Sequence, residues 1–350
     1  MSVLDLIRPE LKRVNNYMPG GDEANCRLHA NELPWSPVSA TLPINRYPDE
    51  RNLYQLQQQL AHYYQVDMQQ LAITRGSDDG IDQLMRLFLR PGQDSILQCP
   101  PTFPMYVFYA QLQNAGIINC PLDAENDFAL DVEKLFNSWQ PDCKLIMLCQ
   151  PNNPTGNTIA LTDISKICNH FDNQAVVIVD EAYIEFAATE SAASLINTFD
   201  NLIVLRTLSK ACGMAGLRVG SVLAQQPLIE ALRRIIAPYH MAAPVLSLAL
   251  QALQNQEWFT QSIQTILAER LRMQSALQSF PWVEKIFSSQ ANFLMIKSPV
   301  AQALFHWLAK HDIAVRSFGS SSDLASMLRI TIGSPAQNDE LLAVLSRFNN

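Results

Sequence analysis

Three polar residues that can do chemistry each follow a short apolar run in this sequence. Asn153 comes after the run 144–149, Asp180 directly follows 175–179, and Lys210 lies just beyond 202–205. A lysine amine becomes a nucleophile that forms Schiff bases when burial or a neighbouring positive charge lowers its pKa. An aspartate in the same crevice can hold a protonated nitrogen of a ligand. The pattern therefore indicates a small-molecule site built from strand ends.

Each of these residues also has an ordinary structural explanation. Asn-Pro-Thr-Gly at 153–156 is good turn chemistry, because proline restricts φ and glycine accepts positive φ. Asp180 is placed where a helix cap is common, and Lys210 in a serine-containing loop can be a solvated surface residue. These alternatives stay open for each residue alone. Their joint occurrence at successive strand ends favours a site.

The apolar runs predict the fold class. The runs 95–99, 144–149, 175–179 and 202–205 are aliphatic throughout, which is typical of strands buried on both faces of a parallel sheet. Helical periodicity between them, at 52–64 and 80–90, completes an α/β pattern. In such sheets, ligands bind outside the carboxyl ends of the strands. Asn153, Asp180 and Lys210 are then expected to converge on one crevice.

The pattern changes beyond about residue 244. A long helical stretch, 245–280, is followed by a few short strands and further helices, which predicts a smaller α+β domain. We expect a large domain over residues 29–244 and a small domain formed by residues 1–28 together with 245–350. The predicted elements of this second part are strands at 292–296, 313–316 and 327–332, and helices at 301–309 and 338–348.

Composition excludes several classes of function. The formal net charge of −8 argues against nucleic acid or an anionic membrane as a partner, because both favour clustered lysine and arginine. No apolar stretch approaches the roughly 20 residues of a membrane-spanning helix, and the first 19 residues do not resemble a signal peptide. We therefore expect a soluble cytoplasmic protein.

Cysteine and histidine patterns predict neither disulfides nor a metal site. The seven cysteines are odd in number, contain no C-x-x-C pair and mostly lie within apolar runs, as expected of reduced, buried thiols. The six histidines show no H-E-x-x-H spacing and no cluster with cysteine.

Taken together, the strand-end motifs resemble a known family. N-N-P-T-G (152–156), D-E-A-Y (180–183), T-L-S-K (207–210) and A-G-L-R-V-G (215–220) are similar to the signature of fold-type-I aminotransferases that depend on pyridoxal 5′-phosphate (PLP). Longer strings resemble the histidinol-phosphate aminotransferase branch, and the likeness extends from about residue 29 to the C-terminus. These strings are R-Y-P-D (46–49), R-G-S-D-D-G-I (75–81), D-E-A-Y-I-E-F (180–186), L-R-T-L-S-K-A (205–211), A-P-Y (237–239) and L-R-I-T-I-G (328–333).

The resemblance implies roles around the cofactor ring. Lys210 would carry PLP as a Schiff base and shuttle the substrate α-proton, and Asp180 would pair with the pyridine nitrogen so that the ring accepts electrons. Asn153 and Tyr183 would hydrogen-bond the 3′-oxygen of the ring, although Tyr183 also fits a buried strand-end aromatic. Tyr106 matches the family aromatic that stacks on the ring, in preference to its neighbour Phe103.

The resemblance also implies an anion site for the cofactor phosphate. Ser77 and Asp78 open the helical segment before residue 90, and a helix N-terminus binds anions through its free N–H groups. We expect the Asp78 backbone to face the phosphate while its carboxylate turns away. Ser209 and Arg218 would complete the phosphate cup, Arg218 as a bidentate donor. Tyr47 matches a tyrosine that reaches the phosphate of the neighbouring subunit, which implies a homodimer.

Two arginines are implied to bind the substrate. Arg329 lies in a short strand, where an unpaired charge is costly, and matches the arginine that binds the glutamate α-carboxylate or the phosphate of the other substrate. Arg316 is the expected second cation, and Tyr17 is expected to contribute a hydroxyl. A structural ion pair is the alternative for either arginine.

The activity implied is a transamination between L-glutamate and imidazole acetol phosphate, giving L-histidinol phosphate and 2-oxoglutarate. An aromatic amino-acid aminotransferase on the same scaffold is an alternative, because it shares most of these motifs. A threonine-phosphate decarboxylase fits D-E-A-Y-I-E-F and L-R-T-L-S-K-A less well. A PLP-fold protein that binds without turnover is disfavoured, because every implied catalytic position is filled.

Overall fold

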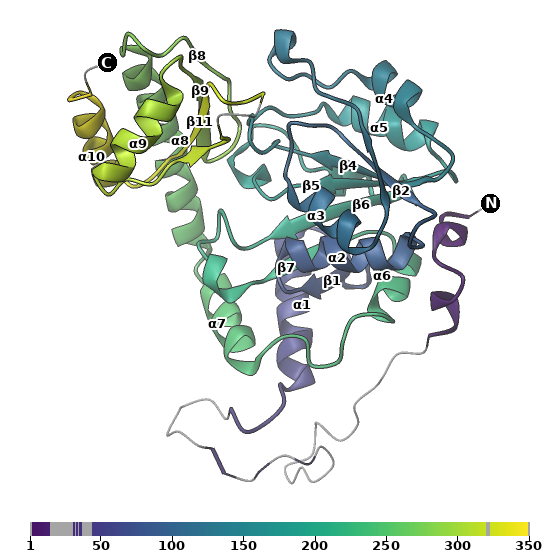
Figure 1. Ribbon diagram of the computed structural model, residues 1–350. Coiled ribbons are helices and arrows are strands. Elements are labelled where there is room, and N and C mark those ends of the chain that lie inside the picture. Colours follow the sequence, from purple (N-terminus) through teal and green to yellow (C-terminus); the bar gives the residue numbers. More distant parts are fainter. Residues whose placement is uncertain are drawn as a thin grey trace.

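Two sheets of different size organise the molecule (Figure 1). The computed structural model describes residues 2–14, 31, 33, 35–36, 44–319 and 323–348. A seven-stranded sheet lies between helices in the larger unit, and a four-stranded sheet with its own helices forms the smaller unit at the C-terminal end of the chain.

The large sheet confirms the predicted α/β architecture. Six of its strands run in the same direction, and β7 alone is antiparallel to both of its neighbours, β1 and β6. In spatial order the strands are β1 (Leu71–Thr74), β7 (Gly220–Leu223), β6 (Leu202–Thr207), β5 (Val176–Asp180), β4 (Cys143–Cys149), β2 (Ser95–Gln98) and β3 (Gly116–Asn119).

Strand residues alternate between two cores on opposite faces of this sheet. In β5, Val177 and Val179 belong to one core cluster, and Val176 and Ile178 belong to the other. Every residue of this strand is buried, which explains why its sequence is an unbroken aliphatic run rather than an alternating one. Covering helices must therefore lie on both faces.

Helices on both faces provide these covers. Buried residues of α1 (Glu50–Tyr64) and α5 (Leu161–His170) join the first core, while those of α2 (Ser77–Phe88), α3 (Met105–Leu112) and α6 (Gln226–Arg233) join the second. On the first face, α4 (Val132–Ser138) packs beside α5 and contributes Leu135. Short 3₁₀ helices occur at η1 (Val3–Leu6), η2 (Leu11–Arg13), η3 (Met68–Gln70), η4 (Ala124–Asn126), η5 (Ile184–Phe186), η6 (Ala192–Leu195) and η7 (Ala215–Leu217).

The smaller unit is an antiparallel sheet packed against helices. Its strands lie in the order β10 (Arg316–Ser317), β11 (Met327–Thr331), β9 (Phe293–Lys297) and β8 (Lys285–Ile286). A separate core joins this sheet to α8 (Gln256–Gln278), α9 (Ala301–Lys310) and α10 (Pro335–Leu345).

The predicted helical stretch 245–280 is two helices. The first, α7 (Ala243–Leu253), packs against α1 of the larger unit, and the chain breaks at Gln254 and Asn255 before α8 begins. The Asn255 side chain caps α8 by accepting a hydrogen bond from the Trp258 N–H at 3.4 Å. Polar Gln254-Asn255-Gln256 interrupts the apolar face, and asparagine is a preferred N-cap residue.

The start of the chain packs on the larger unit, which differs from its predicted place in the small domain. Val3 and Ile7 are buried in the core beside α2, and the Arg8 N–H donates to the Leu87 carbonyl oxygen at 3.1 Å. The strands of the two sheets nevertheless lie on either side of the proposed boundary at residue 244. None of the described helices has the length and apolar character needed to cross a membrane.

A close backbone approach joins β7 to the start of α2. A Cβ atom on Gly220 would lie 2.4 Å from the carbonyl carbon of Gly76 and 2.5 Å from the backbone nitrogen of Ser77. Gly76 itself has a φ of +81°, a left-handed conformation that glycine adopts at little cost. Any side chain at position 220 would push the start of α2 away from the sheet.

We predict that Gly220→Ala lowers the free energy of unfolding by about 2 kcal/mol, because the clash is with backbone atoms that cannot rotate away. Urea unfolding of the cofactor-free protein measures this change. Gly216→Ala is the matched control, since a Cβ atom there meets nothing within 4 Å. Equal stability of the two variants would contradict this explanation of Gly220.

Candidate active site

One cavity collects most of the residues that the sequence singled out. It opens at the carboxyl ends of β4, β5 and β6, beside the first turn of α2. Parallel strands end at the same edge of a sheet, so residues about thirty positions apart in the sequence meet there. The cavity is lined by Ser77, Asp78, Phe103, Cys149, Asn153, Asp180, Ala182, Tyr183, Thr207, Ser209, Lys210 and Arg218.

The Lys210 amine lies beside an aromatic ring in this cavity. Its Nζ is 5.5 Å from the centroid of the Tyr183 ring. Burial lowers the pKa of Lys210, and the positive charge of Arg329 lowers it further. Both influences favour the neutral amine, which is the nucleophilic form needed to attack a carbonyl group.

Asp180 is a buried carboxylate held by two donors. Its Oδ2 accepts a hydrogen bond from the Tyr106 hydroxyl at 2.8 Å, and its Oδ1 accepts one from the Ala182 N–H at 3.2 Å. Burial raises the pKa of Asp180 to about 6, although both hydrogen bonds act in the opposite direction. None of the ion pairs among the described residues includes this carboxylate. A cationic N–H donor in the cavity would supply the missing countercharge, and a protonated pyridine nitrogen is such a donor.

The structure does not place Tyr106 where a ring could stack on it. The side chain is 0 % exposed and lies behind Asp180, while Phe103 lines the cavity. The two rings meet edge to face, with centroids 5.7 Å apart. On α3, Tyr106 is directed into the core between the helix and the sheet, whereas Phe103 precedes the helix on the cavity side. The predicted stacking role therefore fits Phe103 and not Tyr106.

A cup suited to an anion lies where β7 meets α2. The Arg218 Nη1 donates to the Ser209 Oγ and to the Ala215 carbonyl oxygen, both at 3.3 Å. A Cβ atom on Gly76 would lie 2.6 Å from the Arg218 Nη2, so glycine leaves room for the guanidinium group. The positive end of α2 opens into the same space at Ser77.

Asp78 differs from its predicted orientation. Its carboxylate does not turn away but accepts from the Arg218 Nη2 at 3.1 Å, in a partly exposed ion pair. The cup thus holds one carboxylate and one guanidinium group. An anion with more charge than a carboxylate would compete for the Arg218 donors.

Arg329 reaches the cavity from the small sheet. Its Nη1 donates a short hydrogen bond to the Asn153 Oδ1, and its guanidinium carbon lies 5.2 Å from the centroid of the Phe293 ring. Its Nε is buried and has no hydrogen-bond partner among the described residues. Arg316 is paired with Arg329 in the strand register and is exposed. Burial lowers the pKa of Arg329, and the charge of Arg316 adds to that effect.

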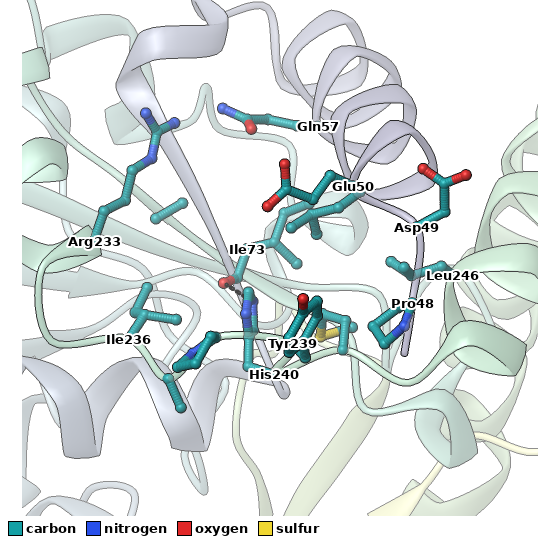
Figure 2. Close-up of a pocket in the computed structure, with 15 residues that line it drawn as sticks. Pro48, Asp49, Glu50, Gln57, Ile73, Arg233, Ile236, Tyr239, His240 and Leu246 are labelled. Atoms are coloured by element: carbon teal, nitrogen blue, oxygen red, sulfur yellow. Dashed lines mark hydrogen bonds between the residues drawn. The ribbon is translucent and has the colours of Figure 1, made fainter. Parts of the chain in front are cut away.

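Two predicted residues lie elsewhere. Tyr17 is outside the described residues. Tyr47 is half exposed, is not among the residues that line the Lys210 cavity, and stacks on Tyr239 with centroids 4.5 Å apart. Tyr239 lines a second cavity of about 420 Å³ that lies between the start of α1, β1 and the segment 236–241. Figure 2 shows this cavity, with the His240 ring hydrogen-bonded to the Ile73 carbonyl oxygen and Arg233 on the far side from Asp49.

A buried ionic network lies beneath the site and was not predicted from the sequence. The Arg206 Nη2 donates to the Glu185 Oε1 at 2.7 Å, and the Nη1 lies 3.7 Å from the Glu181 Oε2. Arg206 and Glu181 are next to predicted site residues in the sequence. Their side chains nevertheless lie on the other face of the sheet, where the Tyr64 ring covers the Arg206 guanidinium group. The alternation of side chains along β6 was the available signal, because Arg206 precedes the cavity-lining Thr207.

The arrangement combines four functions in one cavity. It contains a lysine whose pKa is lowered, a buried carboxylate with no cation, an aromatic face at Phe103 and a cup of anion donors at Arg218. A flat, cationic heterocycle that bears an aldehyde and a phosphate group would satisfy all four. Among the described residues, no group of three or more His, Cys, Asp and Glu side chains could hold a metal ion.

Comparisons with known proteins agree with this chemistry. The family model described as aminotransferase class I and II matches residues 15–345. Histidinol-phosphate aminotransferase 1 of Legionella pneumophila (strain Lens) is 51% identical over 350 residues, which cover 100% of this chain and 96% of that protein. The histidinol-phosphate aminotransferase of Stenotrophomonas maltophilia is 41% identical, covering 98% of this chain and 96% of that protein.

A solved structure extends the similarity to a cofactor complex. Histidinol-phosphate aminotransferase from Sinorhizobium meliloti, in complex with pyridoxal-5′-phosphate, matches with a TM-score of 0.77 and 25% identity. The match covers 86% of this chain and 82% of that one.

The buried carboxylate leads to a prediction about stability and pH. Because the pKa of Asp180 is raised from 3.8 to about 6 in the folded protein, its contribution to stability is present below pH 3.8 and is lost as the pH rises through about 6. Relative to Asp180→Asn, the cofactor-free wild type should lose on the order of 2 kcal/mol of unfolding free energy over this interval.

Urea unfolding at several pH values between about 4 and 8 measures this difference. Asp142→Asn, at an exposed carboxylate, is the control and should follow the wild-type pH dependence. If wild type and Asp180→Asn lose stability in parallel, the carboxylate is not destabilised by burial.

Proposed function

Since this chain belongs to the class I and II aminotransferases, and within them to the histidinol-phosphate aminotransferases, we propose that it transfers an amino group from L-glutamate to imidazole acetol phosphate. The products are 2-oxoglutarate and L-histidinol phosphate, a step of histidine biosynthesis. The enzyme is PLP-dependent, as its family is. The observation that carries the proposal is the convergence of Lys210, Asp180 and Arg218 on one cavity in a chain 51% identical to a histidinol-phosphate aminotransferase.

The cavity residues divide the binding of the cofactor among them. When bound, PLP supplies an electron sink for the carbon that loses its proton. Asp180 would hold the ring nitrogen, Phe103 would cover one ring face, and Asn153 and Tyr183 would hydrogen-bond the ring oxygen. Ser77, Asp78 through its backbone, Ser209 and Arg218 would bind the phosphate.

Lys210 would then serve twice. It would anchor the cofactor covalently, and its Nζ, once freed by the substrate amine, would accept the substrate α-proton and donate it again within the site. The lowered pKa of Lys210 supports this role, because it favours the neutral amine, which is the form that accepts a proton. Both substrates would use this one site, with the amino group held there between the two half-reactions, so they bind in turn.

Arg329 and Arg316 would bind the anionic end of each substrate. Glutamate presents an α-carboxylate, and histidinol phosphate presents a phosphate in its place. The unpartnered, buried Nε of Arg329 supports a role in binding, because a buried donor without a partner costs on the order of 1–3 kcal/mol until a ligand accepts from it. Tyr17 is retained as a third candidate in this part of the site.

We also propose a homodimer in which Tyr47 reaches the cofactor phosphate of the partner subunit. Its half-exposed ring, stacked on Tyr239 outside the Lys210 cavity of its own chain, supports this arrangement. A cytoplasmic location is proposed as well. It is supported by the six described cysteines, which are all free, because reducing compartments keep thiols reduced.

We expect Lys210→Ala to lose transamination by at least about a thousandfold, because both the covalent anchor and the proton carrier are removed. The measurement is turnover of histidinol phosphate with 2-oxoglutarate, together with the visible absorption band of the bound cofactor. Lys144→Ala, at a lysine near the start of β4, is the matched control and should keep wild-type turnover. Retained turnover in Lys210→Ala would refute the proposed mechanism.

Substrate choice is tested by single-turnover reactions of the wild type. Histidinol phosphate should convert the cofactor to its amine form much faster than phenylalanine does, because only the phosphate can use the two arginines fully. Faster reaction with phenylalanine would favour an aromatic amino-acid aminotransferase. Release of carbon dioxide from threonine phosphate would favour the decarboxylase, and cofactor binding without any turnover would favour a binding protein.

Mixed dimers test the position of Tyr47. In a dimer of one Lys210→Ala chain and one Tyr47→Ala chain, a tyrosine acting across the interface leaves one fully intact site. Co-expression should then restore up to about half of the wild-type turnover per dimer, well above the sum of the two parent variants. A co-expressed sample no more active than its Tyr47→Ala parent would show that Tyr47 acts within its own chain.

A further inference from the structure

Tyr106 is a buried tyrosine whose hydroxyl is directed at Asp180, with the Cys149 thiol beside it. The side chain is 0 % exposed and is held in the core between α3 and the large sheet. Its hydroxyl donates to the Asp180 Oδ2 at 2.8 Å, from a residue 74 positions away in the sequence. Burying a tyrosine hydroxyl is unfavourable without such a partner, so this contact is a specific one.

One hydrogen-bond donor to Asp180 precedes it in the sequence and the other follows it. Ala182 donates from the loop that follows β5 itself, whereas Tyr106 donates from α3. With both oxygens engaged, rotation of the carboxylate would break at least one hydrogen bond. The remaining acceptor positions are those available to a ligand in the cavity that Asp180 lines.

We propose that Tyr106 is a positioning residue whose buried hydroxyl fixes the orientation in which the Asp180 carboxylate receives the cofactor ring nitrogen. This inference rests on the proposed function and adds a residue to it. The same short segment also carries Phe103, whose ring packs edge to face on Tyr106. The ring face and the ring nitrogen would therefore be set by one rigid structural element.

The Tyr106 hydroxyl helps to keep the Asp180 carboxylate ionised. Burial raises the pKa of Tyr106 well above its ordinary value, so the hydroxyl keeps its proton and remains a donor. Its hydrogen bond is the foremost influence that lowers the pKa of Asp180 against the effect of burial. The other titratable groups that act on Asp180, or are acted on by it, are Asp78 on α2, Cys149 on β4, Tyr183 beyond β5, and Lys210.

Removing the hydroxyl should thus weaken the ring-nitrogen contact in a pH-dependent way. In Tyr106→Phe the carboxylate should be protonated to a higher pH, and a neutral carboxyl cannot pair with a protonated ring. The probe is pyridoxamine 5′-phosphate, which cannot form a Schiff base with Lys210, so its dissociation constant reports the ring and phosphate contacts alone. Its affinity for the cofactor-free full chain is measured by fluorescence titration between about pH 6 and 8.

We expect Tyr106→Phe to bind this probe about tenfold more weakly near pH 8, with a larger loss near pH 6. Tyr64→Phe is the matched control. Tyr64 is another buried tyrosine, on α1 and in the other core, and its variant should keep wild-type affinity at each pH. A purely structural role for Tyr106 would instead lower the unfolding free energy without changing the pH dependence of binding.

A double-mutant cycle tests whether Tyr106 acts through Asp180. In an Asp180→Asn background, adding Tyr106→Phe should change the affinity less than twofold, because the group that it positions is already altered. The inference would be overturned if Tyr106→Phe weakened binding just as much in the Asp180→Asn background. It would also be overturned if Tyr106→Phe kept wild-type affinity over the whole pH range. A wild-type chain that binds no probe would overturn the proposed function itself, which is a distinguishable result.

Discussion

The site depends on burying a carboxylate that forms no ion pair with any side chain among the described residues. Asp180 ends a strand that is covered on both faces, so its charge is held out of water and its pKa rises to about 6. Such a group is costly to an empty protein and becomes favourable when a cationic ring is bound. The hydrogen bonds from Tyr106 and Ala182 limit this cost and direct the carboxylate toward the cavity. The proposed pairing of Asp180 with a protonated ring rests on this constraint.

Backbone geometry supplies the other half of the site. Gly220 allows β7 to approach the start of α2, and Gly76 leaves space for the Arg218 guanidinium group. The cup at Arg218 is therefore made by two segments that touch only because neither has a side chain at the contact. From the small sheet, Arg329 crosses to Asn153 and so connects that sheet to a residue of the Lys210 cavity.

Part of the fold and of the site could be predicted from the sequence. The aliphatic runs before Asn153, Asp180 and Lys210 were sufficient to predict a parallel sheet and a shared crevice, because burial on both faces leaves a distinctive pattern. The four short elements at β1, β3, β7 and β8 were missed, since two to four residues carry too little periodicity. The break at Asn255 was missed, although the polar Gln254-Asn255-Gln256 was the available signal.

The chemistry of a Schiff-base lysine with a carboxylate and anion donors could be predicted from the sequence. Residue types and the order of the motifs are local properties of the chain. Tertiary structure alone decided which aromatic faces the cavity. Phe103 and Tyr106 are three residues apart, and the resemblance favoured Tyr106. The packing of α3 on the sheet instead directs Phe103 to the cavity and Tyr106 to Asp180. It also decided that the Asp78 carboxylate pairs with Arg218, a residue 140 positions away. Side-chain direction depends on contacts between distant segments, and a linear pattern does not contain them.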